Sequence, residues 1–265
     1  MTNPTLAAGT VEHHLRARRD AGRGLLMPYV TGGITPGWTD YLRAFAAAGA
    51  DAIEVGLPFS DPTLDGVTIQ QANDTALARG ASTRRILADL AELPDLGVPL
   101  VASTYYNLVL HDGDEAFCAA LRRAGVSGLI VPDLPVHEAG ELTEVAAAGI
   151  ELVLLASPAT PEPRLEEISR RSRGFVYAVS LMGTTGERAG LAASAAELTA
   201  RIRRGTDRPV LLGFGISTPD QAREAGRHAD GVVVGAAVMR RVLDGAGPDD
   251  LLAFLATLRR ALDQE

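Results

Sequence analysis

The feature that most constrains this chain is a regular alternation of short apolar segments with longer segments of helical periodicity. Because the apolar segments are nearly continuous, without strict polar alternation, they predict strands that are covered on both faces, as in a parallel sheet. The expected strands are 25–31, 52–57, 97–104, 128–132, 151–156, 175–180, 209–214 and 231–235.

Helical periodicity lies between these segments. The expected helices are 36–48, 82–92, 114–124, 137–147, 161–171, 193–203, 218–226 and 249–263, with a short one at 236–243. Three of them begin with Thr-Pro in the sequence, at Thr35-Pro36, Thr160-Pro161 and Thr218-Pro219. We expect each threonine to cap its helix, because its hydroxyl can accept from the first amides and proline at the first helical position loses no hydrogen bond.

Eight strand–helix units in 265 residues match the number and size of a (β/α)8, or TIM, barrel. An open, doubly wound sheet is the competing α/β architecture, since periodicity does not report whether a sheet closes. No linker divides the chain, so we expect one barrel domain over 1–265. A further helix at 10–22 is expected to cover the amino end of the barrel.

Composition excludes several classes of function. The 25 basic residues against 33 acidic ones give a net charge of −8, which argues against a nucleic-acid partner. The chain has no lysine, so neither a Schiff base nor a nucleotide P-loop can form within it. With one cysteine, Cys118, it has no disulfide and no CxxC motif.

Location and metal content also follow from sequence patterns. No apolar run is long enough to span a bilayer, and the N-terminus does not resemble a signal peptide. We therefore expect a cytoplasmic protein that does not bind membranes. The histidines match no regular ligand spacing, so no metal site is expected.

Carboxylates cluster around the second expected strand. In a (β/α)8 barrel the active site lies at the carboxyl ends of the strands. Glu54 lies inside the second strand with apolar neighbours, and Asp61 and Asp65 follow in the loop over 58–66, which we call loop two. Burial would raise the pKa of Glu54 and suit it to moving protons near neutral pH.

Glycines recur at the ends of strands six, seven and eight. They lie in the segments 183–186, 213–217 and 235–237. Loops after the last strands and the amino end of a short extra helix form a recurrent phosphate site in these barrels, which needs no lysine. Tyr29, Tyr105 and Tyr177 lie on or near strand ends. Core packing explains any one of them, but three around one rim also suit a pocket for a flat aromatic group.

The residues alone thus predict a barrel enzyme that acts on a phosphorylated small molecule by carboxylate acid–base catalysis. The block Glu54-Val55-Gly56-Leu57-Pro58-Phe59-Ser60-Asp61-Pro62, with Asp65-Gly66 and Ile69-Gln70 after it, resembles the tryptophan synthase alpha chain family. The resemblance continues in order through Leu26–Thr31, Gly33, Tyr105–Asn107, Asp133–Pro135, Tyr177, Gly183, Thr185, Gly186 and Gly213–Ser217.

This resemblance implies a lyase of L-tryptophan biosynthesis that cleaves indole-3-glycerol phosphate to indole and glyceraldehyde 3-phosphate. It implies that Glu54 moves protons and that Asp65 stabilises the positive charge developing on the indole ring. Thr185, in loop six (181–192), would order Asp65 on closure. The substrate-binding residues that it implies are Tyr29, Tyr105, Tyr177, Thr185, Gly186, Gly215, Gly235 and Ala236, the last four through backbone donors to the phosphate.

The resemblance also implies a partner. The family pairs with a beta chain, in an alpha2-beta2 complex, that carries pyridoxal phosphate and consumes the indole. Loop two, with Pro58 and Asp61, would face that partner. The alpha chain itself would hold no cofactor, which agrees with the absence of lysine.

Four positions depart from the family pattern. Leu64 and Val67 replace the usual Ala and Pro of loop two, Thr184 a usual Val, and Ala236 a common Ser. Together they favour the alternative of a stand-alone lyase that releases free indole without a beta chain. A second alternative is a non-catalytic alpha-like subunit that activates a beta chain, against which the presence of Glu54 and Asp65 argues. A different phosphate-binding barrel, such as a sugar-phosphate isomerase, would not explain the loop-two block.

Overall fold

A computed structural model describes residues 9–146, 149–179, 188–213 and 215–264. Its strands form one closed barrel in chain order, each parallel to the next, and the last strand pairs with the first. The strands are β1 (Leu25–Thr31), β2 (Ile53–Gly56), β3 (Leu100–Ser103), β4 (Val126–Ile130), β5 (Glu151–Ala156), β6 (Val176–Val179), β7 (Val210–Gly213) and β8 (Gly231–Val234). This closure confirms the TIM barrel and excludes the open sheet.

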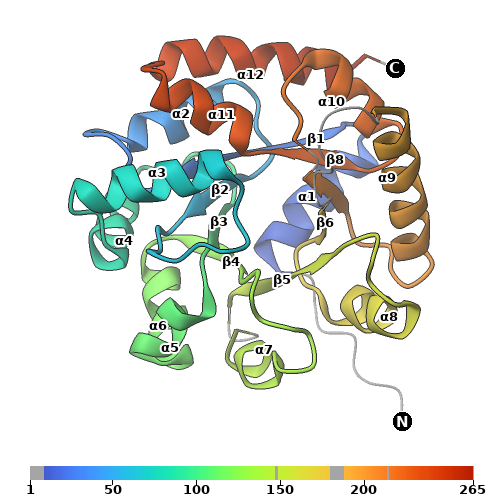
Figure 1. Ribbon diagram of the computed structural model, residues 1–265, viewed down its shortest axis with the longest axis horizontal. Coiled ribbons are helices and arrows are strands. Elements are labelled where there is room, and N and C mark those ends of the chain that lie inside the picture. Colours follow the sequence, from blue (N-terminus) through green and yellow to red (C-terminus); the bar gives the residue numbers. More distant parts are fainter. Residues whose placement is uncertain (1–8, 147–148, 180–187, 214, 265) are drawn as a thin grey trace.

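Helices form an outer ring around these strands (Figure 1). They are α1 (Thr10–Asp20), α2 (Thr39–Ala47), α3 (Val67–Ala78), α4 (Thr83–Ala91), α5 (Tyr106–Asp112), α6 (Asp114–Arg123), α7 (Gly140–Ala146), α8 (Glu162–Arg171), α9 (Arg188–Arg203), α10 (Pro219–Gly226), α11 (Ala236–Leu243) and α12 (Pro248–Leu262). No helix in these described ranges has the length and apolarity needed to cross a membrane.

The three expected Thr-Pro caps have different outcomes. Thr218 caps α10 and completes a capping box with Gln221, as predicted. The expectation for Thr35 is wrong, because Gly37 has a φ of +66°, which a right-handed helix cannot contain, and α2 begins only at Thr39. The expectation for Thr160 is also wrong: its hydroxyl accepts from the amide of Ser157 at 2.9 Å instead.

The apolar core has two layers. One lies between the strands and the outer helices and contains most of the buried residues. The other fills the barrel interior, where Met27, Val101 and Phe175 pack with Val11 and Leu15 of α1. The apolar face of α1 is therefore part of the interior core, and the helix packs against the amino end of the barrel.

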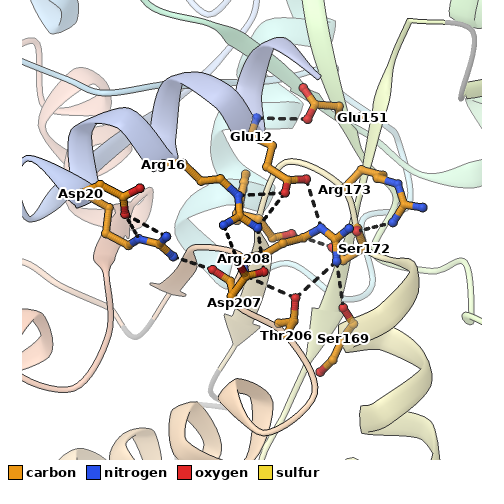
Figure 2. A network of polar contacts seen from close by, with 12 residues as sticks. Glu12, Arg16, Asp20, Glu151, Ser169, Ser172, Arg173, Thr206, Asp207 and Arg208 are labelled. Atoms are coloured by element: carbon orange, nitrogen blue, oxygen red, sulfur yellow. Dashed lines mark hydrogen bonds and ion pairs between the residues drawn. The ribbon is translucent and has the colours of Figure 1, made fainter. Parts of the chain in front are cut away.

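Polar contacts fix α1 in this position (Figure 2). Glu151, at the start of β5, accepts from the amides of Val11 at 2.5 Å and Glu12 at 3.0 Å. These amides begin α1 and have no acceptor within the helix. Arg208 then donates to Glu12 at 3.0 Å, and Arg16 donates to the same carboxylate. The amino end of the barrel is closed by this network, which leaves the carboxyl end for a site.

Candidate active site at the carboxyl end of the barrel

Glu54 is a buried carboxylate on β2. Glu54 is only 4% exposed. Its Oε2 atom is buried and has no hydrogen-bond partner among the described residues. The pKa of Glu54 is raised to about 7, chiefly by burial and also by the charge of Asp65, while a hydrogen bond from Ser103 lowers it. A carboxyl group with such a pKa can give and take a proton near neutral pH.

Asp65 is on loop two, between β2 and α3, and lies near Glu54 of β2. Burial raises its pKa to about 6, while hydrogen bonds from Asn73 and Tyr105 lower it. Gln70 holds the loop by donating from Nε2 to the backbone oxygen of Asp65 at 2.8 Å. The structure thus brings together the two carboxylates that the sequence singled out, both with pKa values above their ordinary range.

Tyr105, between β3 and α5, organises loop two. Its phenol oxygen accepts from the amide of Leu64 at 2.9 Å. Its ring stacks on that of Phe59, with centroids 5.3 Å apart and planes at 29°. Burial, together with the charge of Asp65, raises the pKa of Tyr105 to about 12. Substrate contact by Tyr105 stays a prediction, but its role in shaping loop two is visible in these contacts.

Tyr29 and Tyr177 extend into the same region from β1 and β6. The phenol of Tyr29 shares a hydrogen bond of 3.0 Å with Thr31. Burial raises the pKa of each phenol, and the nearby charges of Glu54 and Asp65 contribute to both. Tyr29 and Tyr177 therefore lie near both carboxylates, and Tyr105 lies near Asp65.

Two glycines make room for these rings. A Cβ at Gly56 would overlap the phenol oxygen of Tyr29, and a Cβ at Gly213 would lie 2.5 Å from Cε2 of Tyr177. Real Cβ atoms do not approach other heavy atoms so closely. A glycine at each strand end is thus a condition for placing a tyrosine inside the barrel mouth.

Two of the predicted phosphate-binding residues, Gly235 and Ala236, lie at the start of α11. Gly215 and Ala236 are exposed and Gly235 is half-buried. Gly235 is the N-cap of α11 and offers no side-chain cap to its first turn. The Val238 amide donates to the Gly235 carbonyl at 3.0 Å, so the amides of Ala236 and Ala237 are the ones that suit an anion. A Cβ at Gly235 would lie 3.6 Å from Cβ of Tyr29, which places this helix end beside the carboxylate pocket.

The remaining predicted residues have varied outcomes. Thr185 and Gly186, with Thr184 and most of loop six, lie outside the described residues. In loop two, Pro58 is buried and Asp61 is exposed. Across the ranges that the structure describes, no group of three or more His, Cys, Asp or Glu side chains could hold a metal ion.

Sequence reasoning missed Asn73 and Ser103, which contact the two carboxylates. Asn73 lies on α3, a helix that the periodicity did not predict, and no motif includes either residue. A groove of about 510 Å³ between α4 and α6 lies on the outer surface and contains none of the site residues. The chemistry is therefore concentrated in the barrel mouth.

Known proteins resemble the chain along nearly its whole length. The family model of the tryptophan synthase alpha chain matches residues 15–261. A tryptophan synthase alpha chain from Picosynechococcus is 40% identical over 261 residues, which are 96% of this chain and 99% of that protein. Another from Chloroflexus aurantiacus is 43% identical over 250 residues, covering 92% of this chain and 93% of that protein.

Solved structures agree in fold. A chain of Mycobacterium tuberculosis tryptophan synthase superposes with a TM-score of 0.90 at 34% identity, covering 98% of this chain and 100% of that one. The tryptophan synthase alpha subunit of Legionella pneumophila gives a TM-score of 0.89 at 28% identity, with 98% and 100% covered.

Proposed function

This chain belongs to the tryptophan synthase alpha chain family, whose members cleave indole-3-glycerol phosphate in tryptophan biosynthesis, and we propose that Glu54 and Asp65 carry out this lyase reaction. The observation that carries the assignment is the pair itself. Two carboxylates with pKa values raised to about 7 and about 6 lie together in the barrel mouth, ringed by three tyrosines.

Glu54 is protonated at the start and again at the end of the catalytic cycle. It donates that proton to C3 of the indole ring, which makes the ring positively charged. The bond between C3 and the glyceryl carbon then breaks, and its electron pair returns to the ring. The hydroxyl on that carbon becomes the aldehyde of glyceraldehyde 3-phosphate and returns a proton to Glu54. General acid–base catalysis of this kind contributes roughly 10²–10⁴-fold.

Asp65 acts in its ionised form. It accepts a hydrogen bond from the indole N–H, so its negative charge lies near the positive charge that develops on the ring. Such preorganised electrostatic stabilisation is usually the largest contribution to catalysis. The low exposure of the neighbouring tyrosines supports this role, because charges interact more strongly where water is excluded.

The phosphate of the substrate binds at the start of α11. Gly215, Gly235 and Ala236 offer backbone amides there, and Gly186 of loop six completes the set. The missing hydroxyl at Ala236 removes one side-chain donor but leaves its amide. The positive end of a helix favours a phosphate without any lysine.

A beta chain is the proposed partner, in an alpha2-beta2 complex. Leu64, Val67 and Leu110 are large apolar side chains that are 60%, 67% and 55% exposed. Leu64 lies in loop two and Val67 begins the helix that follows it, and exposed apolar groups at such a place favour a partner that covers them. Pro58 and Asp61 belong to the same loop and are assigned to this interface. Pyridoxal phosphate requires a lysine, which this chain lacks, so the cofactor belongs to the beta chain. The proposed location of the protein is the cytoplasm.

The test is indole release from indole-3-glycerol phosphate by the purified chain, alone and with a beta chain. We expect weak release alone and a strong increase with the partner. Full activity alone, unchanged by the partner, would instead identify a stand-alone lyase. No release in either case would contradict the catalytic assignment and leave a subunit that only activates the beta chain.

A further inference from the structure

A buried amide contacts the carboxylate of Asp65. Asn73, on α3, is 3% exposed, and its Nδ2 lies 3.4 Å from Oδ2 of Asp65. Its buried neighbours on the same helix are Ala72 and Ala76, so this face of α3 is made of small residues. Burying an amide among such residues is unfavourable unless the amide is hydrogen-bonded, and the Asp65 carboxylate is the partner that it has.

The other contacts on loop two fix its backbone. Gln70 donates to the backbone oxygens of Asp65 at 2.8 Å and Pro62 at 3.5 Å, and the Leu64 amide donates to Tyr105. These bonds set where the Cα of Asp65 lies, but they leave its side-chain torsions free. The carboxylate itself is contacted by Asn73 and by the Tyr105 phenol.

We propose that Asn73 is a positioning residue for the lyase reaction, whose side-chain amide orients the Asp65 carboxylate toward the substrate ring. The proposal rests on the role proposed above for Asp65. An oriented acceptor is needed because electrostatic stabilisation depends on where the charge points as well as on its presence. Asn73 does not touch the substrate in this account and acts only through Asp65.

Electrostatics in the barrel mouth make such a donor necessary. The charges and phenols that face Asp65 are Glu54 from β2, Tyr29 from β1, Tyr105 after β3 and Tyr177 from β6. Burial favours the protonated form of Asp65, whereas hydrogen bonds from Asn73 and Tyr105 favour the ionised form. The amide of Asn73 lowers the pKa of Asp65 and so keeps the carboxylate ionised to lower pH.

Two substitutions test the proposal. Asn73→Leu removes the donor at similar size, and Asn73→Asp keeps the shape but places a second carboxylate against Asp65. For Asn73→Leu we expect kcat for indole release to fall about tenfold, because a hydrogen bond to a charged group is lost, while KM stays within about twofold. For both variants the acidic limb of the pH profile should move to higher pH, more so for Asn73→Asp.

Asp74→Leu is the matched control, because Asp74 is the next residue of α3 and is exposed. It should leave kcat, KM and the pH profile unchanged. A merely structural role for Asn73 would lower the melting temperature without moving the acidic limb, and that result would overturn the proposal. Asn73→Asp keeps the side-chain volume, so it tests the pH profile even if Asn73→Leu folds poorly.

A double substitution separates this proposal from the role of Asp65. In an Asp65→Asn background, Asn73→Leu should cause no further loss, because its effect passes through Asp65. A further tenfold loss there would refute the positioning role. If Asp65→Asn alone retained full activity, the proposed function would fail instead, since the carboxylate would not be needed.

Discussion

Replacing Glu54 with glutamine should stabilise the folded chain at alkaline pH while it removes the proposed activity. The pKa of Glu54 is about 7 in the folded protein, against an ordinary value of 4.5, chiefly because of burial. The folded state therefore holds this proton to higher pH than the unfolded chain does. Its contribution to stability is present below pH 4.5 and is lost as the pH rises through about 7.

The magnitude follows from the two pKa values. At about 1.4 kcal/mol for each pKa unit, the ionised Glu54 destabilises the folded state by ~3 kcal/mol well above pH 7. Glutamine has nearly the same shape and does not ionise, so Glu54→Gln should raise the free energy of unfolding by ~3 kcal/mol at pH 9 and by under about 1 kcal/mol at pH 5.

Urea denaturation at several pH values measures this directly, with fluorescence of Trp38, the chain's one tryptophan, as the signal. The control is Asp74→Asn, which makes the same chemical change at an exposed position of α3 and should give no pH-dependent gain. Parallel pH dependences for the wild type and Glu54→Gln would refute the burial argument, as would an equal gain in the control.

Three further outcomes follow from the site and from the barrel end opposite to it. The pH profile of kcat/KM should be bell-shaped. Its acidic limb should lie near pH 6, where Asp65 gains a proton, and its alkaline limb near pH 7, where Glu54 loses one. A flat profile from pH 5 to pH 9 would count against both roles. Gly215→Asp should raise KM at least about tenfold by repelling the phosphate. It should also lower the melting temperature modestly, because Gly215 has a φ of +67°, which strains a residue with a side chain. An unchanged KM would remove Gly215 from the phosphate site. Glu151→Ala should lower the free energy of unfolding by ~3 kcal/mol, because two buried amides of α1 lose their acceptor. A urea denaturation curve equal to that of the wild type would show that α1 does not depend on this cap.

The barrel was predictable because its signal is repeated. Eight near-continuous apolar segments can all be buried in a parallel sheet, and small errors at each end do not change that inference. Closure depends on the pairing of β8 with β1, for example Leu25 with Gly231, and no local pattern reports such a contact.

Local signals failed where tertiary contacts took priority. Thr35, Thr160 and Thr218 look alike in sequence, but only Thr218 caps its helix. The helix α3 was not predicted, because its buried residues Ala72, Asn73 and Ala76 form no apolar stripe of large side chains.

The candidate site was predictable in part. Glu54 was found because burying a charged residue inside an apolar strand is energetically unfavourable, so its presence there indicates a function. Asn73 was not, since its importance lies only in its distance from Asp65, eight residues earlier on a loop. The stacking of Phe59 on Tyr105 is likewise a property of the folded loop and has no signal in the spacing of the residues.

The central claim is that Glu54 transfers the proton in carbon–carbon cleavage, and indole release by the wild type and Glu54→Gln tests it most directly. Both proteins should be assayed with saturating indole-3-glycerol phosphate, after binding of the substrate to each has been measured. We expect Glu54→Gln to fold and to bind the substrate but to release indole at least about 10²-fold more slowly. Indole release by Glu54→Gln at the wild-type rate would contradict the central claim.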